Sequence, residues 1–300
     1  MVKIKLKTVQ SVLAYAGLFL AVFFWAINTV IAKAVVLEIK PMALSFYRWF
    51  VAFVFILPFA LPHFKKDFNL IRKNLGFLAI LAFPSVAAYN SILYIGAQYT
   101  TATNIAMVVV TMPVMTILFS WIINREKPYF IQAAGVTISL FGMLIIIIRG
   151  SWQVLHSFTF NIGDLLIVLS IASWAFYSVM LKKRKLDISP ISFLTVLICL
   201  GTLCILPFYL WEFAVFGGFK INTTNIYIFL YLGICPSILS YICWNYGVKI
   251  KGASTASVFM CLLPIFTSII AYLFLGESLF PYHLLGGLFI ATGMILSVFK

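Results

Sequence analysis

The chain alternates between long apolar stretches and short polar or charged connections. Each apolar stretch is about 20 residues long, which is the length an α-helix needs to cross the hydrocarbon core of a bilayer. The pattern predicts an all-α integral membrane protein with ten transmembrane helices. We expect these helices at residues 12–34, 41–62, 75–95, 101–123, 128–148, 162–180, 190–211, 227–247, 253–273 and 281–299.

The second half of the chain repeats features of the first. Matched residues recur 149 to 152 positions apart: Trp25 and Trp174, Pro84 and Pro236, Tyr89 and Tyr241, Pro113 and Pro264, Gly135 and Gly286, Gly142 and Gly293. We therefore expect two copies of a five-helix unit, at residues 1–148 and 149–300. Because five is odd, the second copy must cross the membrane in the opposite orientation. Two inverted five-helix repeats are typical of secondary transporters, whose sites lie between the halves.

Composition and charge agree with a membrane protein. Hydrophobic residues make up 64% of the chain and charged residues 9%, whereas an ordinary soluble domain has about 25% charged residues. The net charge of +14 does not indicate nucleic-acid binding, because the cations lie in the connections and no nucleic-acid motif is present. Sixteen of the 21 Lys and Arg residues fall on the side of the N-terminus and four on the other. This bias predicts that both termini are cytoplasmic.

Signals for enzyme chemistry are weak. The five cysteines lie in apolar runs without metal-site spacing, and the chain has no GxxxxGK[ST] phosphate loop. His63 and Asp67 are one residue closer than the H-x4-D pattern of membrane acyltransferases, and no other catalytic pair is visible. We expect no catalytic residue, metal or cofactor. The first apolar stretch is longer than the core of a signal peptide and is expected to be a retained helix.

Four prolines fall near the middle of predicted spans, as the matched pairs Pro84 with Pro236 and Pro113 with Pro264. Proline has no N–H, so each one removes a helical hydrogen bond and frees the carbonyl four residues earlier. These prolines are either hinges or gates beside a cavity, or kinks that serve packing alone. The freed carbonyls are those of Ile80, Leu232, Val109 and Met260.

Aromatic and amide side chains also lie at mid-membrane depth. Trp25 and Trp174 are unusual there, because tryptophan prefers the membrane interfaces. They are either bulky packing residues or the walls of a central cavity that stack on a solute. The candidates for a cavity lining suit a polar but nearly neutral solute, with helix-to-helix hydrogen bonding as the alternative role. They are Trp25, Asn28, Tyr89, Asn90, Tyr94, Trp174, Tyr177, Tyr241, Trp244 and Asn245.

A few charged residues remain to be placed. Arg48 is the one full charge well inside a predicted span and is a functional candidate for that reason. It could instead extend outward to the interface or hold backbone carbonyls. Asp164 fits a helix start better than a proton site. Glu126 and Glu277 are interpreted as turn and helix-start elements, with Pro128 and Pro281 close behind them.

These features together resemble the EamA-type branch of the drug/metabolite transporter superfamily. The resemblance rests on Trp25-Ala26 in the first helix, a proline in the fourth, Gly276-Glu277 after it and spaced glycines in the fifth. In the first copy, Arg125 replaces the glycine of the Gly-Glu pair. The resemblance implies ten helices, cytoplasmic termini and a central cavity lined mainly by the first, third and fourth helices of each copy. It also implies export of small metabolites or drugs across a bacterial cytoplasmic membrane.

The resulting functional hypothesis is a secondary transporter that exports amino acids or amino-acid-like aromatic compounds by alternating access. Its partners would be a small-molecule substrate, the lipid bilayer and a proton as one candidate coupling ion, and no nucleic acid. A metabolite uniporter or importer and a lipid flippase are the alternatives. A sugar-phosphate carrier is disfavoured, because Arg48 is the only buried cation available to hold phosphate. Substrate identity, direction of transport and oligomeric state stay open.

Overall fold

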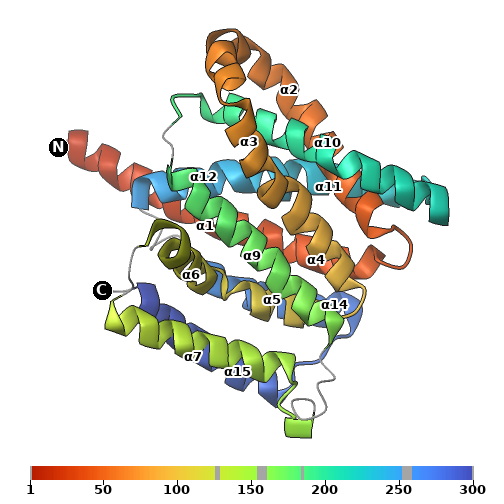
Figure 1. Ribbon diagram of the computed structural model, residues 1–300. Coiled ribbons are helices and arrows are strands. Elements are labelled where there is room, and N and C mark those ends of the chain that lie inside the picture. Colours follow the sequence, from red (N-terminus) through yellow and green to blue (C-terminus); the bar gives the residue numbers. More distant parts are fainter. Residues whose placement is uncertain (1, 126–128, 154–160, 184–185, 252–258, 299–300) are drawn as a thin grey trace.

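The computed structural model describes residues 2–125, 129–153, 161–183, 186–251 and 259–298. Glu126, Pro128 and His156 lie outside these residues. Within them all regular structure is helical, and the helices form one bundle (Figure 1). They are α1 (Val2–Val35), α2 (Pro41–Lys73), α3 (Leu75–Ala82), η1 (Phe83–Ala88), α4 (Tyr89–Ala97), α5 (Ala102–Val109), α6 (Met112–Asn124), α7 (Phe130–Ile147), α9 (Ile162–Lys183), α10 (Pro190–Phe216), α11 (Thr223–Ile234), η2 (Cys235–Leu239), α12 (Ser240–Lys251), η3 (Phe259–Cys261), α14 (Leu262–Leu275) and α15 (Pro281–Val298).

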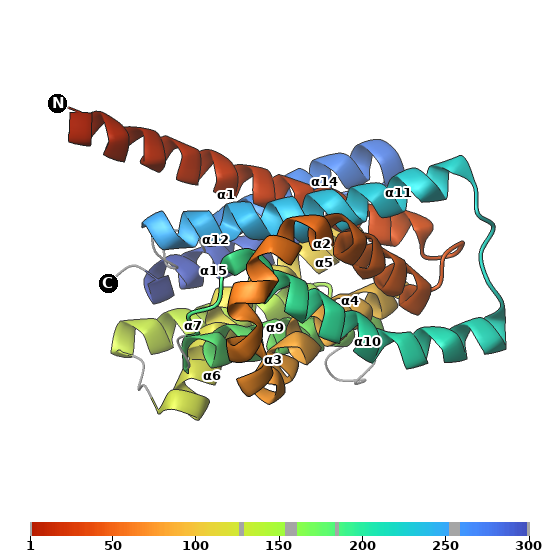
Figure 2. The same ribbon diagram turned by 90° about the horizontal axis from the view of Figure 1, so that it is seen from above.

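Seven helical segments in the described residues are long and apolar enough to cross a membrane. The count is eight if α5 and α6, which meet at a bend of 46°, form one span. The expected all-helical, multi-span architecture is therefore confirmed, whereas the count of ten stays a prediction. The start of α1 and the end of α15 lie at the same end of the bundle in both views (Figures 1 and 2).

Helices α2 and α10 extend beyond the predicted ends of their apolar stretches. A carboxylate near the end of each helix accepts hydrogen bonds from backbone N–H groups at the start of the other. Asp67, in the extension of α2, accepts a hydrogen bond from the backbone N–H of Ser189 before α10 (3.1 Å). Glu212, near the end of α10, accepts from the N–H groups of Met42 and Ala43 at the start of α2 (3.1 and 2.8 Å). A carboxylate at a helix N-terminus satisfies free N–H groups and the helix dipole. The two halves are tied together by this reciprocal pair.

Two of the matched prolines coincide with π-helical turns. Pro84 is the second residue of η1 and Pro236 the second residue of η2. Because proline supplies no N–H and crowds the preceding turn, the helix widens there. Serines that follow the prolines satisfy nearby carbonyls: Ser85 donates to Leu81 (2.6 Å) and Ser237 to Leu232 (2.7 Å). The freed carbonyl predicted at Leu232 therefore has a partner within its own helix.

The second proline pair lies in the other two matched spans, and the first of these spans is broken. The fourth predicted span divides into α5 and α6 between Val109 and Met112. Pro264 is the third residue of α14, and residues 252–258 before it lie outside the described part. The sequence predicts a continuous helix at residues 101–123, whereas α5 ends at Val109 and α6 begins at Met112. Proline has no N–H and crowds the carbonyl four residues earlier, which for Pro113 is the carbonyl of Val109, so the helix is interrupted there.

Helices α7 and α15 pack through glycines. A methyl group on Gly286 would lie 2.8 Å from the carbonyl oxygen of Gly142, and one on Gly293 would collide with the carbonyl of Gly135. Gly135 and Gly286 are matched residues of the two halves, as are Gly142 and Gly293. Gly142 therefore contacts Gly286, and the residues matched to these two, Gly293 and Gly135, contact each other. This is the contact pattern of antiparallel helices related by a two-fold axis. The close packing expected of these glycines is present.

Candidate functional site

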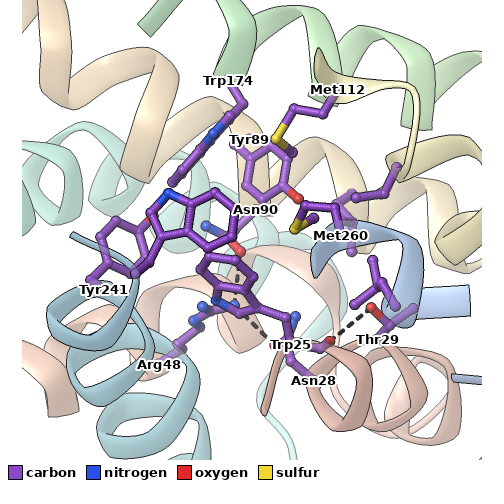
Figure 3. Close-up of a pocket in the computed structure, with 14 residues that line it drawn as sticks. Trp25, Asn28, Thr29, Arg48, Tyr89, Asn90, Met112, Trp174, Tyr241 and Met260 are labelled. Atoms are coloured by element: carbon purple, nitrogen blue, oxygen red, sulfur yellow. Dashed lines mark hydrogen bonds between the residues drawn. The ribbon is translucent and has the colours of Figure 1, made fainter. Parts of the chain in front are cut away.

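A cavity lies at the centre of the bundle, and both halves of the chain line it (Figure 3). The space open to the centres of water molecules is about 40 Å³. One water needs about 10–15 Å³ on this measure, so the cavity holds a few waters and a metabolite requires side chains to move. The lining residues are Trp25, Asn28, Thr29, Arg48, Tyr89, Asn90, Leu93, Val109, Met112, Trp174, Tyr241, Trp244, Met260 and Leu263.

Five aromatic rings form a continuous wall of this cavity. Trp174 contacts Tyr89 and Tyr241, with ring centroids 5.0 and 5.6 Å apart. Trp25 contacts Tyr241 and Trp244 at 6.4 and 5.2 Å. Tyr241 therefore bridges the two matched tryptophans. The arrangement offers several ring faces and edges to a flat apolar solute.

Arg48 forms the polar end of the cavity, on the opposite side from Trp174 and Met112 in Figure 3. Its side chain is 2% exposed. Nη1 donates to Oδ1 of Asn28 (2.9 Å) and to Oδ1 of Asn90 (2.8 Å). It also reaches Oη of Tyr94 (2.7 Å), and Nε donates to Oγ of Ser237 (2.7 Å).

This network decides between the roles considered for Arg48. The side chain neither extends outward to the interface nor holds backbone carbonyls, because its recorded partners are four buried side chains. It links α2 to α1, α4 and η2. Both alternatives considered from the sequence are therefore wrong. The guanidinium carbon also lies 5.0 Å from the ring centroid of Trp49, within the range of a cation–π contact.

Three of the ten predicted lining residues lie elsewhere. Tyr94 is 1% exposed and bonds to Arg48 and to Oδ1 of Asn28 (2.8 Å), which is helix-to-helix bonding. Tyr177 is buried behind Trp174, with ring centroids 5.3 Å apart. Asn245 is exposed and is not among the lining residues. It follows Trp244 directly, and consecutive helical residues point about 100° apart, so the two share no face.

The sequence did not predict the side chains of six lining residues as part of a cavity. They are Thr29, Leu93, Val109, Met112, Met260 and Leu263. Four of them form matched pairs at an offset of 151 residues, Val109 with Met260 and Met112 with Leu263. They lie four and one positions before the matched prolines. The repeat itself could have identified them, whereas nothing in their residue types distinguishes them from packing residues.

The carbonyls of the η1 and η2 prolines are held by the helices that carry the matched tryptophans. Nε1 of Trp25 donates to the carbonyl of Pro236 (3.1 Å). Oγ of Ser173, next to Trp174, donates to the carbonyl of Pro84 (2.8 Å). Each π-helical turn is therefore connected to the cavity wall contributed by the other half of the chain.

Two further carboxylates, those of Glu277 and Asp164, make hydrogen bonds near helix starts. Glu277 accepts from the N–H groups of Ala102 (2.8 Å) and Thr103 (3.0 Å) at the start of α5. Glu277 therefore acts at a helix start, as expected, but the helix is α5 of the first half and not the helix that follows Glu277 in the sequence. Asp164, in the first turn of α9, is fully buried and accepts from Thr100 and from Nδ2 of Asn104 (3.3 Å).

The catalytic pair considered from the sequence is not formed. Asp67 is committed to the start of α10, and Nδ1 of His63 is hydrogen-bonded to the carbonyl of Phe59 in its own helix (3.2 Å). Within the described residues, no group of three or more His, Cys, Asp or Glu side chains is placed to hold a metal ion.

A second hollow, about 670 Å³ in volume, lies between η1, α6 and α9. Its lining is almost wholly apolar, with Phe83, Phe119 and Phe176 among its residues. Ser173 is its one hydroxyl, and that hydroxyl is engaged with the carbonyl of Pro84. The hollow offers no groups that would hold a charged lipid headgroup.

Comparison with known proteins gives consistent matches. The model of the EamA-like transporter family matches the chain twice, at residues 12–148 and 161–299. A protein of Archaeoglobus fulgidus is 27% identical over 289 residues, covering 94% of this chain and 96% of that protein. YyaM of Bacillus subtilis is 26% identical over 230 residues, covering 75% and 73%. Both are described as uncharacterized transporters. A solved crystal structure superposes with a TM-score of 0.63 at 13% identity, covering 97% of this chain and 96% of the other, a likeness of fold.

Proposed function

This chain belongs to the EamA-like transporter family, and we propose that it exports small metabolites by alternating access. The metabolites are amino acids or amino-acid-like aromatic compounds, and drugs of similar shape. The observation that carries the proposal is the central cavity, in which four of the five aromatic wall residues are matched residues of the two halves. Tyr241 lies between the matched tryptophans, so displacement of either ring opens the same space to a solute.

Inverted repeats supply the mechanism in this proposal. The family model matches each half of the chain separately, and the glycine contacts of α7 and α15 are those of antiparallel, two-fold-related helices. Two halves related in this way have two mirror-related arrangements of similar energy, one open to each side of the membrane. Residues 1–148 and 149–300 are then the two five-helix units, and the ten spans include the broken pair α5 and α6.

The four prolines are the proposed hinges. Pro84 and Pro236 lie in π-helical turns whose carbonyls are bound by side chains from α1 and α9. Such a turn changes its bonding at lower cost than a regular helix, because its hydrogen bonds are already shared with side chains. Pro113 and Pro264 belong to the helices that contribute Met112 and Leu263 to the cavity.

The bias of Lys and Arg toward one side supports cytoplasmic termini in a bacterial inner membrane. A net outward flux of solute through such a protein requires a coupling ion or a favourable solute gradient. A proton is the coupling ion that we propose, with Asp164 and His283 as buried titratable groups joined through Asn104. His283 bonds to Oδ1 of Asn104 at 2.7 Å, so Asn104 is hydrogen-bonded to both titratable groups and orients them.

A mass-spectrometric survey of medium and cytoplasm tests the function. Cells that overproduce the chain should enrich one class of small amphipathic metabolite in the medium, relative to cells with an empty vector. Depletion of a medium component into the cells would replace export by import. Redistribution of lipids between leaflets, with no change in metabolites, would favour a flippase and remove the metabolite proposal. The apolar lining of the second hollow gives that outcome little support.

A further inference from the structure

The residues that line the polar end of the cavity, Asn28, Arg48 and Asn90, all come from the first half of the chain, and Ser237 of the second half supports Arg48 from outside the lining. The aromatic and apolar walls include matched pairs, such as Trp25 with Trp174 and Tyr89 with Tyr241. In contrast, Arg48 corresponds to Leu197 at the offset of 149 residues, and Asn90 corresponds to Ile242 at the offset of 152. Leu197 is 1% exposed, so the second half packs the equivalent position without any cation. The repeat fold therefore does not need a charge there.

Arg48 carries a positive charge that no carboxylate neutralises. Of the seven Asp and Glu residues, Glu126 lies outside the described part, and none of the other six bonds to Arg48. All four recorded partners are neutral. Nη2 makes no hydrogen bond within the described residues, which leaves two N–H donors of the guanidinium without an acceptor there. A buried cation in this condition is unfavourable unless an anion approaches it.

Asn90 adds a second unused donor at the same place. Its side chain is 2% exposed and lines the cavity. Oδ1 faces Nη1 of Arg48, so the orientation of the amide is fixed by that bond. Nδ2 is buried and has no hydrogen-bond partner among the described residues. An unpartnered buried donor beside an unneutralised cation is the arrangement that a bound anion would complete.

We infer that the transported solute carries a carboxylate, which binds Arg48 and Nδ2 of Asn90 while its apolar body lies against the aromatic wall. This inference rests on the proposed function. A carboxylate has one negative charge and two acceptor oxygens, which match one cation and two sets of donors. A phosphate ester carries about −1.5 to −2 charges and would exceed the single positive charge. Amines and neutral alcohols leave Arg48 without a counter-charge.

The inference predicts selectivity within a set of compounds that share one ring. Phenylacetate, phenylalanine, 2-phenylethanol and 2-phenylethylamine differ in charge and little in shape. We expect the full-length protein in lipid nanodiscs to bind phenylacetate and phenylalanine about tenfold or more tightly than the alcohol and the amine, the ratio expected for a charge-assisted hydrogen bond. Equilibrium binding of the labelled compounds gives the four affinities.

Asn90→Asp separates the charge of Arg48 from its role in packing. The new carboxylate stands where Oδ1 now accepts from Nη1, so the link between α2 and α4 is kept and the net charge of the cavity falls to zero. Preference for the two carboxylates should drop to about parity, with the folded protein retained in a thermal unfolding scan. If that variant does not fold, Asn28→Asp makes the same change at the other amide acceptor (2.9 Å).

Asn222→Asp is the matched control. Asn222 is exposed and begins α11, where its Oδ1 accepts from the N–H of Asn225 (2.8 Å). Aspartate caps a helix equally well, so this variant adds one negative charge remote from the cavity. Its binding preference should equal that of the unaltered protein.

Equal affinities for phenylacetate and 2-phenylethanol would overturn the inference and leave the proposed function standing, since both would bind the cavity. An unchanged preference in Asn90→Asp would also overturn it, because Arg48 would then act only in packing. Failure of all four compounds to bind would overturn it as well. The metabolite survey decides the proposed function separately, because that survey presumes no particular ligand.

Discussion

Nη1 of Arg48 donates to Oδ1 of Asn90 at 2.8 Å, and the amide nitrogen of Asn90 is buried without a partner in the part of the chain that the structure describes. The two side chains come from α2 and α4, which belong to consecutive predicted spans, and they lie 42 residues apart in the sequence. Together they give the cavity a polar end that has no counterpart in the second half of the chain. The same bond ties α2 to α4 and therefore also contributes to stability.

Arg48→Lys should destabilise the fold. Lysine keeps the charge, but its ammonium has three donors at one point and does not reproduce the separate Nε and Nη1 contacts with four acceptors. We expect a loss of about 1–2 kcal/mol in unfolding free energy, measured by thermal unfolding in nanodiscs. Arg149→Lys, at an exposed position after α7, is the control and should leave the melting temperature unchanged. Equal melting temperatures for both variants would show that the network contributes nothing.

Neighbouring glycines in α15 should respond in opposite ways to alanine. A methyl group on Gly286 meets Cγ1 of Ile146 at 2.5 Å and the carbonyl of Gly142 at 2.8 Å. Gly286→Ala should therefore cost about 1–3 kcal/mol through overpacking against α7. On Gly287 the nearest atom is Sδ of Met107 at 3.4 Å, so Gly287→Ala fits and gains about 0.5–1 kcal/mol of helix propensity. Thermal unfolding of the two variants checks this, and equal stabilities would contradict the glycine contact between α7 and α15.

Glu277→Ala should weaken the start of α5. The variant leaves the N–H groups of Ala102 and Thr103 without their acceptor, at an expected cost of about 1–2 kcal/mol. Unfolding by heat, followed by circular dichroism, gives the change. Glu38→Ala removes an exposed carboxylate from the turn after α1 and should have no effect. A Glu277→Ala protein as stable as the control would mean that solvent can replace this cap.

Pro84→Ala and Pro236→Ala should slow transport while the protein stays folded. Alanine supplies the missing N–H, so the π-helical turn can close into a regular α-helix. The new N–H groups would bond to the carbonyls four residues earlier, those of Ile80 and Leu232, and would stiffen the helix at the turn. We expect about a tenfold lower flux in membrane vesicles, equivalent to about 1.4 kcal/mol in the barrier.

Pro207→Ala is the control for the hinge variants. Pro207 lies inside α10, is exposed and takes no part in the cavity lining. Its flux should match that of the unaltered protein. Loss of flux in all three variants would assign the effect to helix strain in general, and no loss in the first two would remove the hinges from the mechanism.

Repetition within the sequence located much of the site. Trp25, Trp174, Tyr89 and Tyr241 were identified because bulky aromatic residues recur at matched mid-membrane depth, and the structure brings them together around one cavity. The repeat in the sequence predicts that these residues share a cavity, because in inverted repeats the site lies between the two halves. The glycines of α7 and α15 are predictable for the same reason.

The polar end of the cavity could not be predicted in the same way. Asn28, Asn90 and Ser237 come from three elements, and their convergence on Arg48 depends on how those elements cross. Asn245 was misassigned because a polar residue in an apolar helix was assumed to face inward, and it is exposed. The helix breaks at Val109 and around the π-helical turns also needed the structure, because proline allows a kink, a break or a widened turn alike.

The most direct test of the central cavity as the transport site compares two tryptophan variants. Trp174→Ala removes a ring that contacts both Tyr89 and Tyr241, whereas Trp211→Ala removes a 63% exposed ring from α10. The flux of the exported metabolite would be measured in membrane vesicles with equal amounts of each folded protein. The account predicts about a tenfold loss for Trp174→Ala, as expected for about 1.4 kcal/mol, and none for Trp211→Ala. Equal flux in the two variants would contradict the account, because the solute would then cross without contacting the aromatic wall.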